Sequence, residues 1–563
     1  MRCSQFPILW FSFLQEVLVS GTGRSPRSDY TFSVVPRADI PRSVFKRDHG
    51  HKTTMNANML VPIYVDEALP GDTFTLSLQL FARLATPIVP IMDNLYADVF
   101  FFAVPNRILW THWVNMMGEQ ANPGDSTSYT VPQVNVPASA GVGTIWDYFG
   151  LPTGLANFYT VNALPLRAYN KIWNRWFRDQ NLQSSVAENV GDGPDVSADY
   201  AIKSRGKRHD YFTSCLPWPQ KFTAPTLALS GFATVSGQSS RLLSGGQTPV
   251  TAFYKTGGAT PASNASMSFG ATAGQMYGAG SGASGQVDSI YFGNLAADMS
   301  TATGFTINAM RQAFQIQKML ERDARGGTRY PEKILAHFGV TNPDMRMQYP
   351  EYLGGGTIPI MINPVAQTGV IQRDNAGAPI TNSTPQGNLA GFGVASGHAN
   401  GFTKSFTEHM TLLGLLQIRG DITYQQGLRK MWSRSTQYDF YWPALSHLGE
   451  QAVLQGEIYY SAVANSDAIV FGYQERWAEY RYFPSIITGQ FRSTYTTPLD
   501  VWHLAQKFTV APTLGDTFIQ DNPPISRIVA VPSYPQFLVD MFFQIKSARP
   551  MPLFSVPGLI DHF

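Results

Sequence analysis

The chain has 563 residues, more than one ordinary domain needs, and its 41 basic and 39 acidic side chains leave a formal net charge of +2. This near balance gives no overall attraction for nucleic acid, so any such binding has to come from local patches. Only 14% of the residues are charged, against about 25% in an average chain, which suits a surface that partners bury. The two cysteines, Cys3 and Cys215, exclude a disulfide framework and a cysteine-rich zinc site.

Residues 1–28 stand apart from the rest of the chain. Arg2 and the apolar run 6–14 imitate a secretory signal, but Gln15 and Glu16 interrupt the run and no clean cleavage site follows. A membrane-spanning helix needs about 20 apolar residues, and no segment of the chain qualifies. We predict an atypical, disordered N-terminal extension, with a cleaved signal as the alternative, and no membrane insertion.

Residues 29–72 are polar, interrupted by prolines and locally basic, which predicts an extended arm. Its candidate nucleic-acid contacts are Arg42, Lys46, Arg47 and Lys52, because cations neutralise phosphates. The pair His49 and His51 lacks a third ligand at a suitable spacing, so a solvated or interface pair is favoured over a metal site. We predict no metal and no cofactor.

Strand patterns begin at residues 73–81, where Phe74, Leu76, Leu78 and Leu80 alternate with polar residues and predict one buried face. The apolar stretch 95–104 predicts a deeper strand. Further strands are predicted at 358–362, 457–462, 468–473, 477–483 and 537–545. Many short strands with long loops predict a mainly β protein, an antiparallel sandwich or jelly roll.

Helical periodicity is confined to a few segments. A short helical stretch is predicted at 108–117, stopped by Gly118. One helical face carries Leu166, Tyr169, Trp173 and Trp176, with Asn162 as candidate cap. A second helix is predicted over 307–324, capped by Thr306, with the apolar stripe Ala309, Ala313, Ile316 and Leu320. Both apolar faces predict packing in the core.

Residues 226–304 are rich in Gly, Ala, Ser and Thr, and their charged residues are Arg241, Lys255, Asp288 and Asp298. So few large aliphatic residues cannot form an ordinary independent core. Aromatic residues are nevertheless present, among them Phe253, Tyr254, Phe269 and Tyr277. We predict a large surface insertion that is ordered by contacts with copies of itself, with a disordered insertion as the alternative.

Sequence motifs for catalysis are missing. The chain has no phosphate-binding loop, no GxSxG, no HExxH and no EF-hand loop, and Gly354, Gly355 and Gly356 are interpreted as a turn. We therefore predict that the protein is not an enzyme.

A second basic segment is the most suggestive feature for binding. Lys203, Arg205, Lys207 and Arg208 lie next to Tyr211 and Phe212, and cations beside aromatic faces suit unpaired nucleic acid. The alternative is a solvated charge cluster or a set of salt bridges between subunits.

Several ordered blocks of sequence carry a family resemblance. They include residues 35–45 (VPRADIPRSVF), 49–54 (HGHKTT), 60–67 (LVPIYVDE), 207–221 (KRHDYFTSCLPWPQK), 350–355 (PEYLGG) and 475–482 (ERWAEYRY). In these blocks the chain resembles the major capsid proteins of gokushoviruses, small icosahedral bacteriophages of the Microviridae. Residues 1–28 lie outside the resemblance.

The resemblance implies an eight-stranded jelly roll with large loop insertions and a few short helices. It implies self-assembly, through pentamers and threefold contacts, into a T=1 icosahedral shell around a circular single-stranded DNA genome. A small basic DNA-binding protein, a minor pilot-type protein and a host surface receptor would be further partners. The protein would be found in the virion and assembled in the host bacterial cytoplasm. Insertion 226–304 would form the threefold protrusion, with Phe253, Tyr254, Phe269 and Tyr277 as receptor-facing candidates.

The expected organisation is an extension (1–28), an arm (29–72), a first jelly-roll part (73–225), the insertion (226–304), a second jelly-roll part (305–548) and an extended tail (549–563). In a capsid jelly roll the first and last strands are neighbours, so residues 73–81 are predicted to pair antiparallel with 537–545. Two other classes stay open from the residues alone. One is a secreted β-sandwich adhesin or carbohydrate-binding protein, and the other is a β-rich hydrolase with a dispersed site.

Overall fold

The computed structural model describes residues 41–225 apart from Ser139, and residues 306–554 apart from Asn342, Met345, Gln367, 369–375 and 377–386. Within 226–305 it describes six short strands and no side chains. The predicted extension 1–28, the end of the tail and most of the insertion therefore lie outside the described residues.

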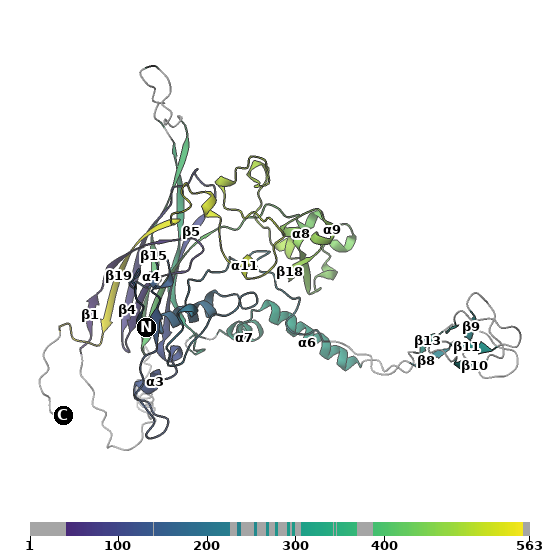
Figure 1. Ribbon diagram of the computed structural model, residues 1–563, viewed down its shortest axis with the longest axis horizontal. Coiled ribbons are helices and arrows are strands. Elements are labelled where there is room, and N and C mark those ends of the chain that lie inside the picture. The colour runs from purple at the N-terminus through teal and green to yellow at the C-terminus, as the bar shows by residue number, and fades with distance from the viewer. Residues whose placement is uncertain are drawn as a thin grey trace, which may run out of the picture.

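A large antiparallel sheet dominates the protein (Figure 1). Eight strands lie on one hydrogen-bonded path in the order β1-β19-β4-β15-β14-β5-β16-β3, and β2 also pairs with β19. The nine strands are β1 (Ser43–Lys46), β2 (His49–Met55), β3 (Val61–Ala68), β4 (Thr73–Leu84), β5 (Leu95–Pro105), β14 (Glu351–Ala366), β15 (Leu389–Ser405), β16 (Met410–Gly420) and β19 (Phe537–Arg549). The curled, mainly β arrangement confirms the predicted jelly roll.

The predicted pairing of the two clearest alternating segments is confirmed. β4 and β19 are antiparallel neighbours over their whole lengths, from the pair Thr73 and Ala548 to the pair Leu84 and Phe537. Every second residue of each strand is buried, as period-two alternation requires. The last strand of the described chain therefore lies beside β4, the first of its long strands.

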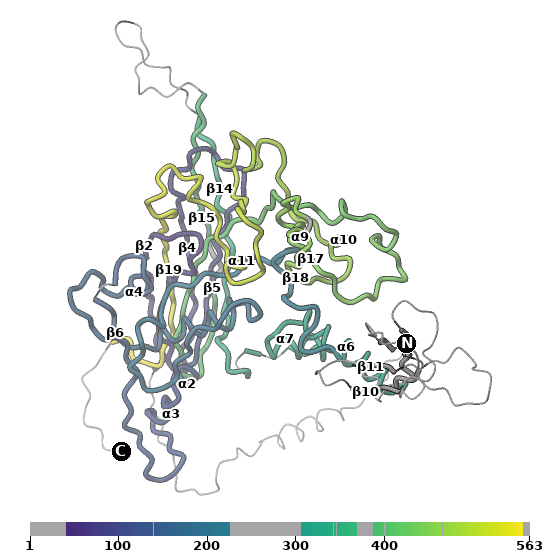
Figure 2. The backbone as a smooth tube through the Cα atoms, turned by 45° about the vertical axis from the view of Figure 1, so that its right-hand side comes forward, coloured from purple at the N-terminus to yellow at the C-terminus, as the bar shows by residue number. Residues whose placement is uncertain are grey.

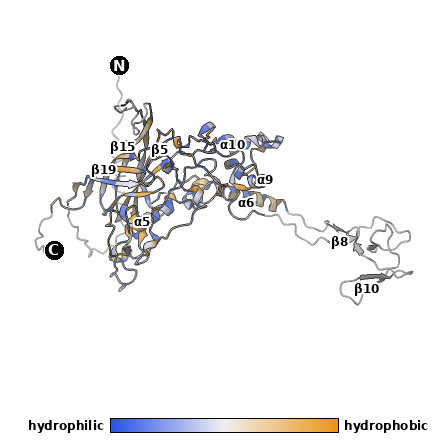
Figure 3. Ribbon diagram, turned by 45° about the horizontal axis from the view of Figure 1, so that its top comes forward, coloured by the Kyte–Doolittle hydropathy of each residue, from blue (hydrophilic) through white to orange (hydrophobic). Residues whose placement is uncertain are grey.

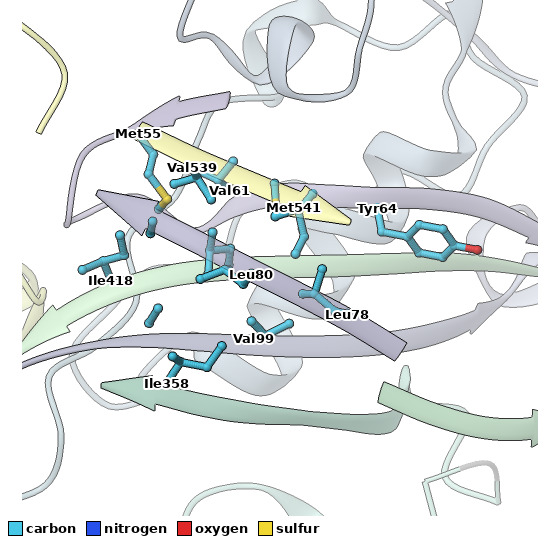
Figure 4. Close-up of a cluster of buried hydrophobic side chains, with 14 of the residues drawn as sticks. Met55, Val61, Tyr64, Leu78, Leu80, Val99, Ile358, Ile418, Val539 and Met541 are labelled. Atoms are coloured by element: carbon cyan, nitrogen blue, oxygen red, sulfur yellow. The ribbon is translucent and has the colours of Figure 1, made fainter. Parts of the chain in front are cut away.

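Strand β14 joins the two halves of the sheet. Its first part, Glu351 to Ile360, pairs with β5, and its last part, Met361 to Ala366, pairs with β15. Side chains from both halves meet in one apolar core (Figure 4), to which β4, β19, β5 and β16 contribute Leu78, Met541, Val99 and Ile418. Figure 3 shows hydrophobic residues along the strands of this sheet.

The glycine run at 354–356 is not a turn, contrary to the prediction. It lies inside β14, where the register with β5 shifts between Tyr352 and Gly354. A Cβ added at Gly355 would lie 2.0 Å from the carbonyl oxygen of Val99. Glycine is needed here for the close approach of two strands, a role that the local sequence does not distinguish from a turn.

The arm contributes strands to both ends of the sheet path. β1 and β2 pair with β19, whereas β3 pairs with β16. The first four residues of β3 are buried, so this part of the arm belongs to the packed body. The polar composition of β2 fits its position at an edge.

Helices and small strand pairs cover the sheet and extend to one side. The helices are α2 (Asn106–Leu109), α3 (Trp113–Met116), α4 (Ile145–Tyr148), α5 (Leu164–Ile172), α6 (Ile307–Arg325), α7 (Tyr330–Phe338), α8 (Gln455–Ile458), α9 (Ala464–Asp467), α10 (Ala478–Arg481) and α11 (Asp516–Ile519). β6 (Gln133–Val136) pairs with β7 (Tyr159–Asn162), and β17 (Glu450–Leu454) pairs with β18 (Val470–Glu475). None of the helices in the described part is long and apolar enough to cross a membrane.

The first predicted helix is confirmed, but Trp176, the last residue of its predicted buried face, is 40% exposed. α5 continues into a π-helical turn, Trp173–Phe177. Leu166, Tyr169 and Trp173 are buried in a second apolar cluster against β5 and β16. The N-cap is Ala163 and not the predicted Asn162, although the Oδ1 of Asn162 accepts a hydrogen bond from the Leu164 N–H at 2.9 Å.

Two predicted strands are wrong. Residues 457–462 begin inside α8, where the Glu457 carboxylate accepts a hydrogen bond from the backbone N–H of Leu454 at 3.1 Å. Residues 477–483 contain α10, and Trp477 before it has a φ of 70°. A residue in this left-handed conformation interrupts a strand, so side-chain alternation alone misled the prediction.

The second predicted helix forms, but its predicted burial is wrong. α6 is capped by Thr306, whose side chain accepts a hydrogen bond from Ala309 N–H. Its buried residues are Leu320, Asp323 and Ala324, all near its C-terminal end, so Leu320 of the predicted stripe is buried, whereas Ile316 is 36% exposed. Figures 1 and 2 show why: α7 lies next to the body, and α6 projects away from it.

The described strands of the insertion pair in a nested order. β8 (Thr234–Gly237) pairs with β13 (Leu295–Asp298), β9 (Phe253–Lys255) with β12 (Ile290–Phe292), and β10 (Ser266–Phe269) with β11 (Met276–Ala279). The chain therefore runs outward through three strands and returns through their partners. Figure 1 shows these strands beyond α6, far from the large sheet.

Candidate functional site

The arm's candidate cations are engaged in contacts that hold the sheet edge together. Arg47 forms two hydrogen bonds with the Asp66 carboxylate, at 2.6 and 3.0 Å, and this contact raises the pKa of Arg47. Lys46 pairs with Asp48 and Lys52 with Asp540, each at 3.0 Å. Arg42 donates to the Thr73 hydroxyl at 3.1 Å.

The second basic segment is more buried than its composition suggests. Arg205 pairs with Asp98 at 2.9 Å and lies over the ring of Phe100. Lys207 is buried, its Nζ donates to Gln506 Oε1 at 2.9 Å, and it lies over the ring of Phe518. Burial lowers the pKa of Lys203, which is only partly exposed.

Arg208 differs from these neighbours. Its side chain is exposed and, among the described residues, has no hydrogen-bond or ion-pair partner. The backbone N–H of Leu60, which follows β2, donates to the carbonyl of Lys203 at 2.9 Å. The second basic segment therefore contacts the arm at Leu60, beyond the arm's own basic residues Arg42 to Lys52.

A buried charge network anchors the second basic segment to the sheet. Asp98 contacts both Arg205 and Arg419. Burial alone would raise the pKa of Asp98, but hydrogen bonds from Thr357 and Arg419 keep that pKa below its usual value. Burial raises the pKa of Asp521 to about 7 and lowers that of Lys207 to about 8.

An exposed aromatic surface, which the sequence analysis missed, lies beside α10. It consists of Trp432, Tyr438, Phe440, Tyr441, Trp442, Tyr480, Tyr482 and Phe483. Arg429 stacks on Phe483 at 3.8 Å and Arg434 on Tyr480 at 4.2 Å. Next to it is a cavity of about 760 Å³. The density of aromatic residues between 430 and 442 was the signal that could have revealed it.

This surface has the composition of a protein–protein contact. Tyr, Trp, Phe, Met and Arg are enriched in interface cores, and large exposed apolar patches mark sites of association. Exposed apolar side chains are also found on α6, at Ile307, Phe314 and Met319.

The receptor candidates lie on the insertion strands. Phe253 and Tyr254 are in β9, opposite Phe292 and Tyr291 of β12. Phe269 ends β10, and Tyr277 lies in β11, opposite Ser268. Three different strands therefore carry the four candidates.

The two arm histidines make ordinary structural contacts. The Nδ1 atom of His51 is 2.9 Å from the carbonyl oxygen of Ile63, and the ring of His49 stacks on Phe543. Within the described ranges, no group of three or more His, Cys, Asp or Glu side chains could hold a metal ion.

A jelly roll is the architecture of many viral coat subunits, and the exposed apolar side chains suit contacts between subunits. The family described as "Capsid protein (F protein)" matches residues 33–559, and the chain belongs to this family. The resemblance to Microviridae capsid proteins is thereby confirmed, and the chain has a structural role in the virion.

Curated relatives agree over nearly full lengths. The chain is 46% identical to capsid protein VP1 of Bdellovibrio phage phiMH2K, covering 96% of this chain and 99% of that protein. It is 41% identical to capsid protein VP1 of Chlamydia phage 1 and 34% identical to that of Spiroplasma virus 4. In both cases 94% of this chain and 97% of the relative are covered.

Proposed function

We propose that this capsid protein assembles, through pentamers and threefold contacts, into a closed T=1 icosahedral shell around a circular single-stranded DNA genome in the host cytoplasm. The observation that carries the proposal is the large apolar surface that a single folded chain leaves uncovered. Trp432 is 70% exposed and Phe314 is 67% exposed. Neighbouring copies would remove these side chains from water, at roughly 25 cal/mol per Å² of apolar area.

The insertion 226–304 is proposed to form the threefold protrusion and to contact the host receptor. Its strands pair with one another, which suits a separate projecting element. Loops carried on a rigid β scaffold commonly serve recognition. Phe253, Tyr254, Phe269 and Tyr277 are the proposed receptor-facing residues.

Genome contact is proposed for the basic segments. Arg208 is the strongest of the eight candidates, because it is exposed and lacks an acidic partner in the described structure. A small basic DNA-binding protein and a minor pilot-type protein are proposed as further partners. The acidic partners of Lys46, Arg47 and Lys52 make these three weaker candidates.

The test is negative-stain electron microscopy of the purified protein, produced from Met1 and separately from Ser28. Uniform closed shells or regular pentameric assemblies are expected. If neither protein forms them, either alone or with the small basic partner and single-stranded DNA, the shell proposal is wrong.

A further inference from the structure

The turn between α6 and α7 closes one side of a large polar cavity. The cavity has a volume of about 920 Å³, within the range of small-ligand sites. Its other walls come from residues 176–182, which end the π-helical turn, and from residues 205–209 of the second basic segment. Gly327 in the turn has a φ of +97°, a conformation that glycine adopts without strain.

Positive charge exceeds negative charge in the cavity wall. Its charged residues are Arg178, Arg205, Lys207, Arg208, Arg325 and Arg329, against Asp179 and Glu332. Arg205, Arg325 and Arg329 each have a carboxylate partner, respectively Asp98, Glu450 and Glu332. Lys207 is near Asp521, whose charge raises the pKa of the lysine against the larger effect of burial.

Two other arginines of the cavity wall are not neutralised by a carboxylate. Among the described residues, neither Arg178 nor Arg208 has a carboxylate within salt-bridge distance. The Asp179 carboxylate is already engaged, because its Oδ1 accepts the backbone N–H groups of Asn181 and Leu182 at 2.8 and 3.2 Å. The cavity therefore retains uncompensated guanidinium charge.

Two arginines of the cavity wall also carry a buried donor without an acceptor. The Nε atoms of Arg178 and Arg329 are buried and have no partner in the described part of the chain. Arg329 Nη2 donates to the carbonyl of Arg178 at 2.8 Å, so the two segments are held together. These two Nε atoms lie behind the cavity surface, so a ligand would be met by the other nitrogens of the guanidinium groups.

Like charges crowd around Arg178. Burial lowers the pKa of this guanidinium, and the positive charges of Arg329 and Arg175 lower it further. Folding thus brings together cations that repel one another. A bound anion would relieve this repulsion, and planar guanidinium groups match the oxygens of phosphate in a two-point contact.

We propose that this cavity is a phosphate-binding site, with Arg178 and Arg329 at its floor and Arg208 at its rim. The phosphate belongs either to a nucleic-acid backbone or to a free phosphate or nucleotide. The inference that the cavity binds phosphate rests on the cavity alone. The assignment of that phosphate to the genome rests on the proposed function. Because the α6–α7 turn forms one wall, a bound phosphate also braces the helix that leads to the insertion.

The experiment is calorimetric titration of the purified full-length protein at low salt, first with inorganic phosphate and then with an eight-nucleotide thymidine oligomer. Arg178→Gln is expected to weaken phosphate binding at least tenfold, and Arg208→Gln about fivefold, because each removes charge-assisted hydrogen bonds. Arg208 is exposed, so its variant tests the site even if Arg178→Gln disturbs folding. Lys318→Gln, on the exposed face of α6, removes the same charge elsewhere and should leave binding unchanged.

The two probes separate the sources. If both variants weaken phosphate and oligomer binding together, the site takes the nucleic-acid backbone. If they weaken phosphate binding alone, it takes a free phosphate or nucleotide. Absence of saturable phosphate binding, or equal binding by all three variants, would overturn the site. Shell formation, scored separately by electron microscopy, reports on the proposed assembly and not on this cavity.

Discussion

Phe543 in β19 lies directly opposite Leu78 in β4, and both side chains are completely buried. The pair lies where the last long strand meets the first long strand of the described jelly roll. Aromatic and aliphatic side chains opposite each other are a main source of sheet stability. This buried contact therefore stabilises the pairing of the two strands.

Phe543→Ala should destabilise the unassembled subunit by about 3 to 5 kcal/mol, because it leaves a cavity between β4 and β19. Phe542→Ala is the matched control, since Phe542 points away from the core and is 41% exposed. Its cost should stay below about 1 kcal/mol. Urea unfolding of both variants checks this, and similar midpoints would contradict the assigned strand pairing.

Replacing Trp432 and Trp442 by serine should leave the subunit folded but raise the concentration needed for assembly at least tenfold. Large aromatic side chains at an interface centre typically contribute about 2 kcal/mol or more each. Light scattering against protein concentration measures assembly, and circular dichroism checks the fold. Shells that form at the wild-type concentration would place the aromatic surface outside the subunit contacts.

Asp521→Asn should change how stability depends on pH. Burial raises the pKa of Asp521 from 3.8 to about 7 in the folded protein, so ionisation opposes folding. The wild type should lose stability as pH rises from about 4 to 7, by on the order of 3 kcal/mol from this group. The variant should lack that loss.

The measurement is the free energy of unfolding in urea at pH 4.5 and pH 7. Glu119→Gln, at an exposed position, should keep the wild-type difference. An Asp521→Asn protein with the same pH dependence as the wild type would show that Asp521 does not titrate in this range.

Deletion of residues 228–302 should leave soluble, folded protein and impair attachment to the host. The described insertion strands pair only among themselves, and the large sheet draws its strands from outside this region. Circular dichroism and thermal unfolding test the fold, and adsorption of assembled particles to host cells tests attachment. Loss of folding would make the insertion part of the core, and unimpaired adsorption would remove its receptor role.

Local periodicity in the sequence was sufficient to predict β4, β19 and α5. Alternation in β4 and β19 and the helical face from Leu166 to Trp173 describe elements whose buried face packs within the same chain. Periodicity failed at Trp477, where a left-handed backbone conformation ends the strand pattern. It also failed at Gly355, where the neighbouring strand requires glycine.

The sequence by itself determined the mainly β class, the strongest strand pairing and the capsid family, because each follows from local patterns or ordered motifs. Only the tertiary structure decided which apolar residues stay uncovered in one chain. The stripe of α6 indicates burial, but it does not distinguish burial in the same chain from burial by a partner. The structure alone also brought Arg178 and Arg329, 151 residues apart, into contact. The positive charges of these two arginines repel each other strongly only in the folded protein, because folding brings them close together in a medium less polar than water.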